Sequence, residues 1–124
     1  MILTSRWAIC TPSETHFRIA KSSLQNGINI LVEKPLCLNF NEVNTLKNTQ
    51  NIFVGYNLRF HPCIKFLKKI VIQEKILSAN VYVGQYLPNW RPNRNYENSY
   101  SADFKKGGGV LFELSHELDY MICF

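Results

Sequence analysis

The sequence lacks several features that define common classes of protein. No run of about 18 apolar residues occurs, which argues against a transmembrane helix. The first ten residues hold no apolar core followed by small residues, so they do not resemble a secretory signal. The chain has no internal repeat and no low-complexity segment. Because 46% of its 124 residues are hydrophobic and 19% are charged, the composition is that of one ordinary globular domain.

Metal-binding and disulfide patterns are also missing. The four cysteines (Cys10, Cys37, Cys63 and Cys123) are widely spaced and form no CxxC pair. Cys10 and Cys123 lie in apolar runs, where cysteine usually acts as a small core residue. We therefore expect no metal site, and the cysteine usage favours a reducing, cytoplasmic setting.

The excess of basic residues is mild. Lysine and arginine total 14 against 9 acidic residues, which gives a net charge of +5. Lys65, Lys68 and Lys69 share one predicted helical surface, but the lysines are not interleaved with aromatic residues as on a base-stacking platform. We expect neither a nucleic-acid partner nor a membrane partner.

The first half of the chain alternates short apolar runs with helix signals. Three runs are predicted strands, at residues 7–10, 28–33 and 52–56. Helices are predicted to begin at the capping boxes Thr11–Glu14 and Asn39–Glu42 and at His61-Pro62. Such alternation is typical of a parallel sheet covered on both faces.

The second half has a different pattern. Residues 76–87 alternate well enough to predict a long, half-solvated strand. Residues 88–106 form a polar segment of the kind that often binds ligands, and the glycines at 107–109 precede a predicted helix through Ile122. The change predicts a boundary near residue 60 and a second, α+β part.

Polar residues follow each of the three predicted strands: Thr11-Pro12-Ser13, Glu33-Lys34-Pro35 and Tyr56-Asn57. The carboxyl ends of parallel strands meet at one edge of a sheet, which is where ligands bind in such folds. A helix N-terminus there suits a phosphate group. The charge of Lys34 would lower the pKa of a reacting hydroxyl, although an ion pair of Lys34 with Glu33 or another acid is an equally open interpretation.

Glu113, His116 and Asp119 are spaced three residues apart, which places them near one another on one helical face. Carboxylates beside a histidine set its tautomer and tune it for proton transfer. A zinc-protease motif is excluded, because the residue four positions after His116 is Tyr120 rather than histidine. The alternative is an ordinary solvated first helical turn after the glycine run.

Four motifs occur in order along essentially the whole chain. They are ICTPSETH at 9–16, EKP at 33–35, GYNLRFHP at 55–62, and GGG at 107–109 leading to HELD at 116–119. Together they resemble the Gfo/Idh/MocA family of NAD(P)-dependent sugar and cyclitol oxidoreductases. The resemblance implies the C-terminal part of a Rossmann-type parallel sheet (residues 1–60) running into the start of an α+β domain with an open sheet (residues 61–124).

The resemblance also implies roles for individual residues. A hydride would pass between NAD or NADP and a hydroxyl-bearing carbon of a sugar-like substrate, with His116 moving the proton, Lys34 stabilising the alkoxide, and Glu113 or Asp119 orienting His116. The residues implied to border the cofactor are Thr11, Pro12, Ser13, His16, Glu33, Lys34, Asn57, Arg59, Trp90 and Arg91. Members are expected to be homo-oligomers.

Two departures from the family pattern stand out. Many members carry an aspartate four residues before the histidine, where this chain has Phe112, and Glu113 stands three before it. The G-x-G-x-x-G motif that binds a dinucleotide pyrophosphate is absent. We therefore expect an internal segment of such an enzyme, poorly active alone. The alternative is a non-catalytic binding or assembly module derived from the fold, using residues 76–87 and the apolar C-terminus as contact surfaces.

Overall fold

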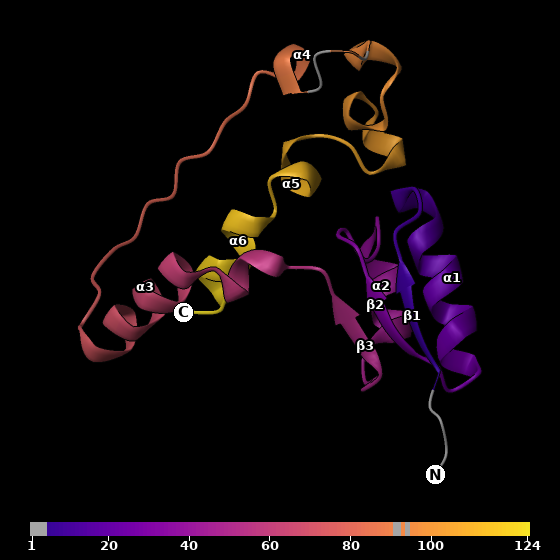
Figure 1. Ribbon diagram of the computed structural model, residues 1–124, viewed down its shortest axis with the longest axis horizontal. Coiled ribbons are helices and arrows are strands. Elements are labelled where there is room, and N and C mark those ends of the chain that lie inside the picture. The colour runs from indigo at the N-terminus through magenta and orange to yellow at the C-terminus, as the bar shows by residue number, and fades with distance from the viewer. Residues whose placement is uncertain (1–4, 91–92, 94) are drawn as a thin grey trace.

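The computed structural model describes residues 5–90, 93 and 95–124 (Figure 1). Its first half is a parallel sheet in the order β1-β2-β3. The strands are β1 (Arg6–Ile9), β2 (Asn29–Val32) and β3 (Ile52–Val54), and they are connected through α1 (Ser13–Gln25) and α2 (Phe40–Leu46). The predicted parallel α/β arrangement is confirmed.

The core lies on one face of this sheet. Ile9, Ile30 and Val32 are each at most 3% exposed and pack against Ala20 of α1 and Leu46 of α2. On the other face, Ala8, Leu31 and Phe53 are exposed. The expectation that both faces are covered is therefore wrong for the described part of the chain, because α1 and α2 both contribute their buried side chains to the same core.

The two predicted capping boxes differ in outcome. Asn39 caps α2, since its side chain accepts a hydrogen bond from the amide of Glu42 at 3.0 Å. Thr11 does not cap α1: the cap position is Pro12, and no side chain accepts from the first amides. The Thr11 hydroxyl instead shares a hydrogen bond of 2.7 Å with the Thr15 hydroxyl.

The chain after β3 passes through the 3₁₀ turn η1 (Asn57–Phe60) into α3 (Pro62–Gln73). This helix begins where predicted, with Nδ1 of His61 accepting from the amide of Cys63 at 3.2 Å. The strand predicted at 76–87 is absent. Residues 75–86 are exposed and run as an extended connection away from the sheet (Figure 1). A strand requires a neighbour to pair its backbone groups, and no described strand lies beside this segment.

The predicted polar loop contains short helical turns. They are α4 (Leu87–Trp90), η2 (Tyr96–Asn98), η3 (Tyr100–Ala102) and η4 (Phe104–Lys106). The predicted last helix is divided into α5 (Val110–Glu113) and α6 (His116–Ile122). No strand occurs in the described residues after 60, so the open sheet and the boundary at 60/61 remain predictions. Among the described helices, none has both the length and the apolar character needed to span a bilayer.

Candidate active site

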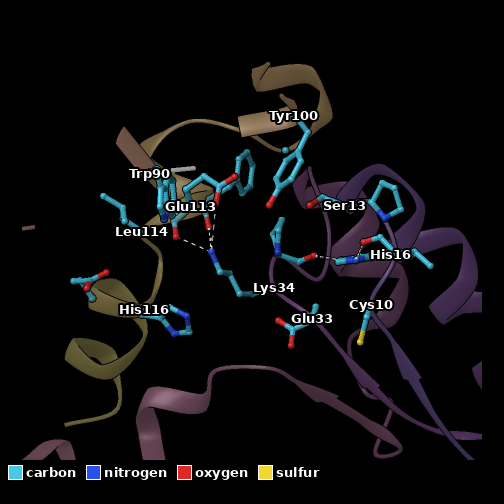
Figure 2. Close-up of a pocket in the computed structure, with 16 residues that line it drawn as sticks. Cys10, Ser13, His16, Glu33, Lys34, Trp90, Tyr100, Glu113, Leu114 and His116 are labelled. Atoms are coloured by element: carbon cyan, nitrogen blue, oxygen red, sulfur yellow. Dashed lines mark hydrogen bonds and ion pairs between the residues drawn. The ribbon is translucent and has the colours of Figure 1, made fainter. Parts of the chain in front are cut away.

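A cavity of about 670 Å³ lies beyond the carboxyl ends of the strands (Figure 2). One wall comes from the segments that follow β1 and β2, and the other from the chain between α4 and α6. The residues that line it are Cys10, Thr11, Pro12, Ser13, His16, Glu33, Lys34, Pro35, Trp90, Tyr100, Gly107, Phe112, Glu113, Leu114, His116 and Glu117. The polar residues at the first two predicted strand ends thus line one cavity, whereas those at the third, Tyr56-Asn57, do not.

Lys34 joins the two walls. Its Nζ donates hydrogen bonds to the main-chain oxygens of Phe112 at 3.1 Å and Glu113 at 2.6 Å. The carboxylate of Glu113 lies 4.0 Å from Nζ, and the Lys34 side chain is only 16% exposed. Lys34 thus has an acidic partner, and that partner is Glu113, which is 79 positions away in the sequence. The peptide bond between Lys34 and Pro35 is cis.

The Lys34 contacts fall at the point where the predicted last helix is divided. Phe112 and Glu113 are the final residues of α5, where helix carbonyls lack an intrahelical partner. Lys34 supplies donors to both, and the hydroxyl of Ser115 donates to Phe112 O at 3.1 Å. A cation at a helix C-terminus is also favoured by the helix dipole.

Glu113 is turned toward the loop. Its Oε1 accepts from the hydroxyl of Ser101 at 2.8 Å, and Ser101 is buried. Gly108 packs closely against the same loop, because a Cβ built on it would lie 2.1 Å from the main-chain oxygen of Tyr100. The short polar segment around Ser101 is thereby fixed against α5.

His116 stands at the start of α6, with its ring directed toward the space that Lys34 and Glu33 also face (Figure 2). The ring makes an edge-on contact with Tyr56, with ring centroids 5.6 Å apart and planes at 88°. Its buried Nδ1 has no hydrogen-bond partner among the described residues. Burial lowers the pKa of His116 below 6.5, and the charge of Lys34 lowers it further, against opposing contributions from Glu117, Asp119 and Glu33. The ring is therefore neutral at pH 7 and able to accept a proton.

The two acids expected to orient His116 are engaged elsewhere. Glu113 interacts with Ser101 and Lys34, and Asp119 accepts two hydrogen bonds from Arg59. The break after α5 separates Glu113 from the helix that carries His116, so the expected single helical face does not form. Neither acid hydrogen-bonds to Nδ1 of His116.

His16 has a mainly architectural position. It is 1% exposed, and its two ring nitrogens lie 2.8 Å from Thr11 O and 2.7 Å from Pro35 O. These carbonyls belong to the segments that follow β1 and β2. His16 therefore fixes two strand-end segments relative to each other, and its ring nitrogens are already occupied.

The structure brings together most of the predicted site. Residues from the first two strand ends, Trp90, Glu113 and His116 line the cavity, whereas Asn57, Arg59 and Asp119 are not among its lining residues. Arg91 lies outside the described residues. Cys10, predicted to be a core residue, is exposed and lines the cavity instead.

Several lining residues were missed by the sequence analysis. Tyr100, Phe112 and Leu114 reach the cavity from the loop, from α5 and from the residue after it. Glu117 of α6, named only as part of the motif at 116–119, lines it as well. Tyr56, which contacts His116, was noted only as part of a motif. The glycine run at 107–109 was the available signal, since closely packed glycines indicate a chain segment held tightly against its surroundings.

These features define a class of protein: a parallel α/β fold of the Rossmann type with a site at its strand ends. Residues 7–51 match the model of the GFO_IDH_MocA oxidoreductase family, described as having an NAD-binding Rossmann fold. This part of the chain therefore carries the sequence pattern of the NAD-binding Rossmann fold of those oxidoreductases.

Individual relatives agree with this assignment. An uncharacterized oxidoreductase of Synechocystis is 27% identical over 91% of this chain and 32% of its own. The UDP-N-acetylglucosamine 3-dehydrogenase of Acidithiobacillus ferrooxidans is 33% identical over 50% of this chain and 21% of its own. The WlbA dehydrogenase of Thermus thermophilus, solved with NAD and UDP-GlcNAcA, superposes with a TM-score of 0.73 at 26% identity, over 96% of this chain and 39% of that one. The chain spans about a third of the Synechocystis relative.

Proposed function

We propose that the cavity is the reacting end of an NAD(P)-dependent oxidoreductase site that acts on a hydroxyl-bearing carbon of a sugar-like substrate. The observation that carries the proposal is the meeting of Lys34 and His116 at one cavity, from parts of the chain far apart in sequence. The NAD-binding family and the relatives named for, or solved with, sugar nucleotides support it.

The residues present fit the nicotinamide end of a dinucleotide. The cavity lies where the fold places its ligands, and it is lined by both apolar and polar side chains. The buried, unpartnered Nδ1 of His116 is the kind of polar atom that a bound molecule satisfies. When bound, the nicotinamide ring supplies the hydride acceptor for alcohol oxidation and the hydride donor for the reverse reaction.

In the direction of alcohol oxidation, His116 would take the proton of the substrate hydroxyl at a ring nitrogen. Its lowered pKa keeps that nitrogen unprotonated at pH 7, as a general base requires. In the reverse direction the protonated ring would return the proton to the alkoxide.

Lys34 would stabilise the negative charge that develops on the substrate oxygen. An ammonium group has three N–H donors, and two of those on Lys34 are used by Phe112 O and Glu113 O. The two fixed hydrogen bonds orient the third donor, so little reorganisation is needed when an oxyanion forms. Glu33, which also lines the cavity, would accept a hydrogen bond from a second hydroxyl of a polyol.

We further propose that the 124-residue chain binds a whole dinucleotide weakly and turns over slowly by itself. The sequence contains no G-x-G-x-x-G motif, so the usual amide cradle for the pyrophosphate is not available from these residues.

A titration of the purified chain with NADH, followed by calorimetry, tests the proposal. We expect dissociation in the millimolar range, and weaker binding still for Lys34→Met. Lys75→Met, which removes a lysine from the exposed connection after α3, is the matched control and should leave binding unchanged. Micromolar affinity would contradict the weak-binding part, and equal binding by Lys34→Met and wild type would contradict the site.

One observation favours the second candidate, a binding or assembly module. The uncovered sheet face exposes Leu31 by 49% and Phe53 by 62%, next to a hollow that Arg6 and Trp7 also line. If that face were the functional surface, Phe53→Ser would abolish self-association or partner binding, and variants of the cavity would not. Sedimentation velocity measures the self-association of Phe53→Ser and of His116→Gln. A loss in the first variant alone would favour the binding module.

A further inference from the structure

The turn η1 and the helix α6 are held together by two separate side-chain contacts. Tyr56, at the start of η1, meets the ring of His116 edge-on at 5.6 Å. Arg59, three residues later, donates from Nε to Oδ2 of Asp119 at 2.7 Å and from Nη2 to Oδ1. The spacing of three matches on both sides, so one turn of each element faces one turn of the other.

A further contact links the two pairs. The guanidinium carbon of Arg59 lies 5.7 Å from the centroid of the Tyr56 ring, within the range of a cation–π contact. Arg59 therefore touches both the acid on α6 and the aromatic ring that touches His116. The four side chains form a closed set in which a displacement of Arg59 affects both contacts.

The burial of the ion pair is one-sided. The Asp119 side chain is 8% exposed, whereas that of Arg59 is 49% exposed. A carboxylate so shielded from water needs a partner with good geometry, and the two-pronged guanidinium supplies it. The pKa of Arg59 is raised, chiefly by its hydrogen bonding to Asp119, so the guanidinium stays charged. Arg59 therefore links η1 to the shielded carboxylate on α6.

His116 has little else to fix its ring. Nδ1 lacks a hydrogen-bond partner in the described part of the chain, so no acid or carbonyl orients the imidazole through that atom. The edge-on contact with Tyr56 is the ring–ring contact recorded for His116 in the described part of the chain. Arg59 contacts both Tyr56, which packs on His116, and Asp119, which lies on α6.

We infer that Arg59 is a positioning residue for His116, acting through Asp119 and Tyr56 rather than on a cofactor. The inference rests on the proposed function for its significance, since it concerns the residue proposed to move the proton. Its geometry stands on the contacts alone. It replaces the cofactor-binding role that the family resemblance implied for Arg59, which does not line the cavity.

Nuclear magnetic resonance of the 124-residue chain tests this directly, because its three histidines give few ring signals. In the wild type we expect a nuclear Overhauser effect between the rings of Tyr56 and His116. Arg59→Ala should remove that effect while circular dichroism still shows a folded chain. Arg59→Lys should weaken it, because an ammonium cannot make both prongs of the pair.

Two further variants keep the test decisive if Arg59→Ala fails to fold. Exchange of the charges in Arg59→Asp with Asp119→Arg should restore the effect, at least in part. Tyr56→Leu should move the ring signal of His116 although it leaves the Arg59–Asp119 pair intact. The matched control is Lys68→Ala, which removes a different link to this part of the chain, a hydrogen bond of 2.7 Å to Cys123 O. It should leave the His116 ring signals unchanged.

The pH titration of His116 provides a readout that general loosening would not reproduce. Asp119 raises the pKa of His116, together with Glu117 and Glu33, while Lys34 lowers it. Without Arg59 the charge of Asp119 is no longer neutralised, so the midpoint of His116 should rise in Arg59→Ala. The charge-exchanged variant places a cation at position 119 and should lower the midpoint instead. The inference is overturned if folded Arg59→Ala keeps both the wild-type effect and the wild-type midpoint, or if Lys68→Ala changes them equally. The two proposals fail separately. A lack of NADH binding would contradict the proposed function, but it would not change the His116 ring signals of the unliganded chain, which test the role of Arg59.

Discussion

Lys34 donates a hydrogen bond of 2.6 Å to the main-chain oxygen of Glu113, a residue on the opposite wall of the cavity. This bond ties the end of β2 to the end of α5, immediately before the helix that carries His116. Lys34 thus has two roles: it holds the two walls of the cavity together, and it places a positive charge there.

Replacement of this lysine should have two separable effects. In Lys34→Met, the two carbonyl oxygens at the end of α5 lose their charged donor, and we expect a loss of about 2 kcal/mol in the free energy of unfolding. The pKa of His116 should rise, because the charge of Lys34 lowers it in the wild type. Urea unfolding measures the first effect and a histidine NMR titration the second. An unchanged His116 midpoint would show that the two side chains do not share one cavity.

The stability of the chain should depend on pH through His116. Its pKa is lowered in the folded state, by burial first and by Lys34 second, relative to an ordinary value of 6.5. Below pH 6.5 the unfolded chain therefore takes up a proton before the folded chain does, and stability falls as the pH decreases toward the lowered value. Above pH 6.5 this contribution is fully present.

The pH dependence can be assigned by difference. His116→Gln should show a shallower fall in stability below pH 6.5 than the wild type, as measured by urea unfolding at several pH values. His61→Gln is the comparison, since His61 is exposed and lies outside the cavity. If the wild type and His116→Gln follow parallel curves, His116 is not desolvated in the folded chain.

Gly108 should tolerate no side chain. A Cβ at this position would lie 2.1 Å from Tyr100 O and 2.6 Å from Ser101 O, both main-chain atoms. We expect Gly108→Ala to cost about 2 kcal/mol and to disturb the loop that supports Glu113. Gly84→Ala is the matched control, because a Cβ there meets nothing within 4 Å. Equal thermal unfolding of the two variants would contradict the close packing.

The cysteines should differ sharply in reactivity. Burial, and the nearby charge of Glu42, raise the pKa of Cys37 to about 11, whereas Cys10 and Cys63 are exposed. With an aromatic disulfide reagent at pH 8, Cys10 and Cys63 should react first. Cys37 should react about a hundred-fold more slowly. Mass spectrometry of partly labelled chain identifies the sites. Early labelling of Cys37 would show that the segment after β2 opens readily.

Local patterns predicted the elements whose stabilising contacts lie close in sequence. The three strands and the start of α2 at Asn39 follow from apolar runs and a cap only three residues from its partner. The strand ends likewise predicted the placement of Thr11, Glu33 and Lys34 at one edge, because parallel strands leave no other arrangement.

Contacts between distant residues account for what was missed. At the break between α5 and α6, Lys34 donates to carbonyls 78 and 79 positions away in the sequence. The hydrophobic periodicity near residue 113 gives no sign of this contact. Asp119 pairs with Arg59 across 60 positions rather than with its neighbour His116. Residues 76–87 alternate as a strand does, yet alternation cannot supply the neighbouring strand that pairing requires.

The central claim is that Lys34 and His116 face one cavity that receives the nicotinamide end of a dinucleotide, and nicotinamide mononucleotide tests it most directly. This probe carries the nicotinamide but lacks the pyrophosphate and the adenosine of the dinucleotide. It therefore does not need the G-x-G-x-x-G motif that is absent from the sequence. A titration followed by NMR should shift the indole signal of Trp90 and the ring signal of His116, saturating in the millimolar range. The signals of Trp7 and His61, which lie away from the cavity, should stay in place. Shifts of Trp7 or His61 alone, or no shift of Trp90 and His116 at saturating probe, would contradict the account.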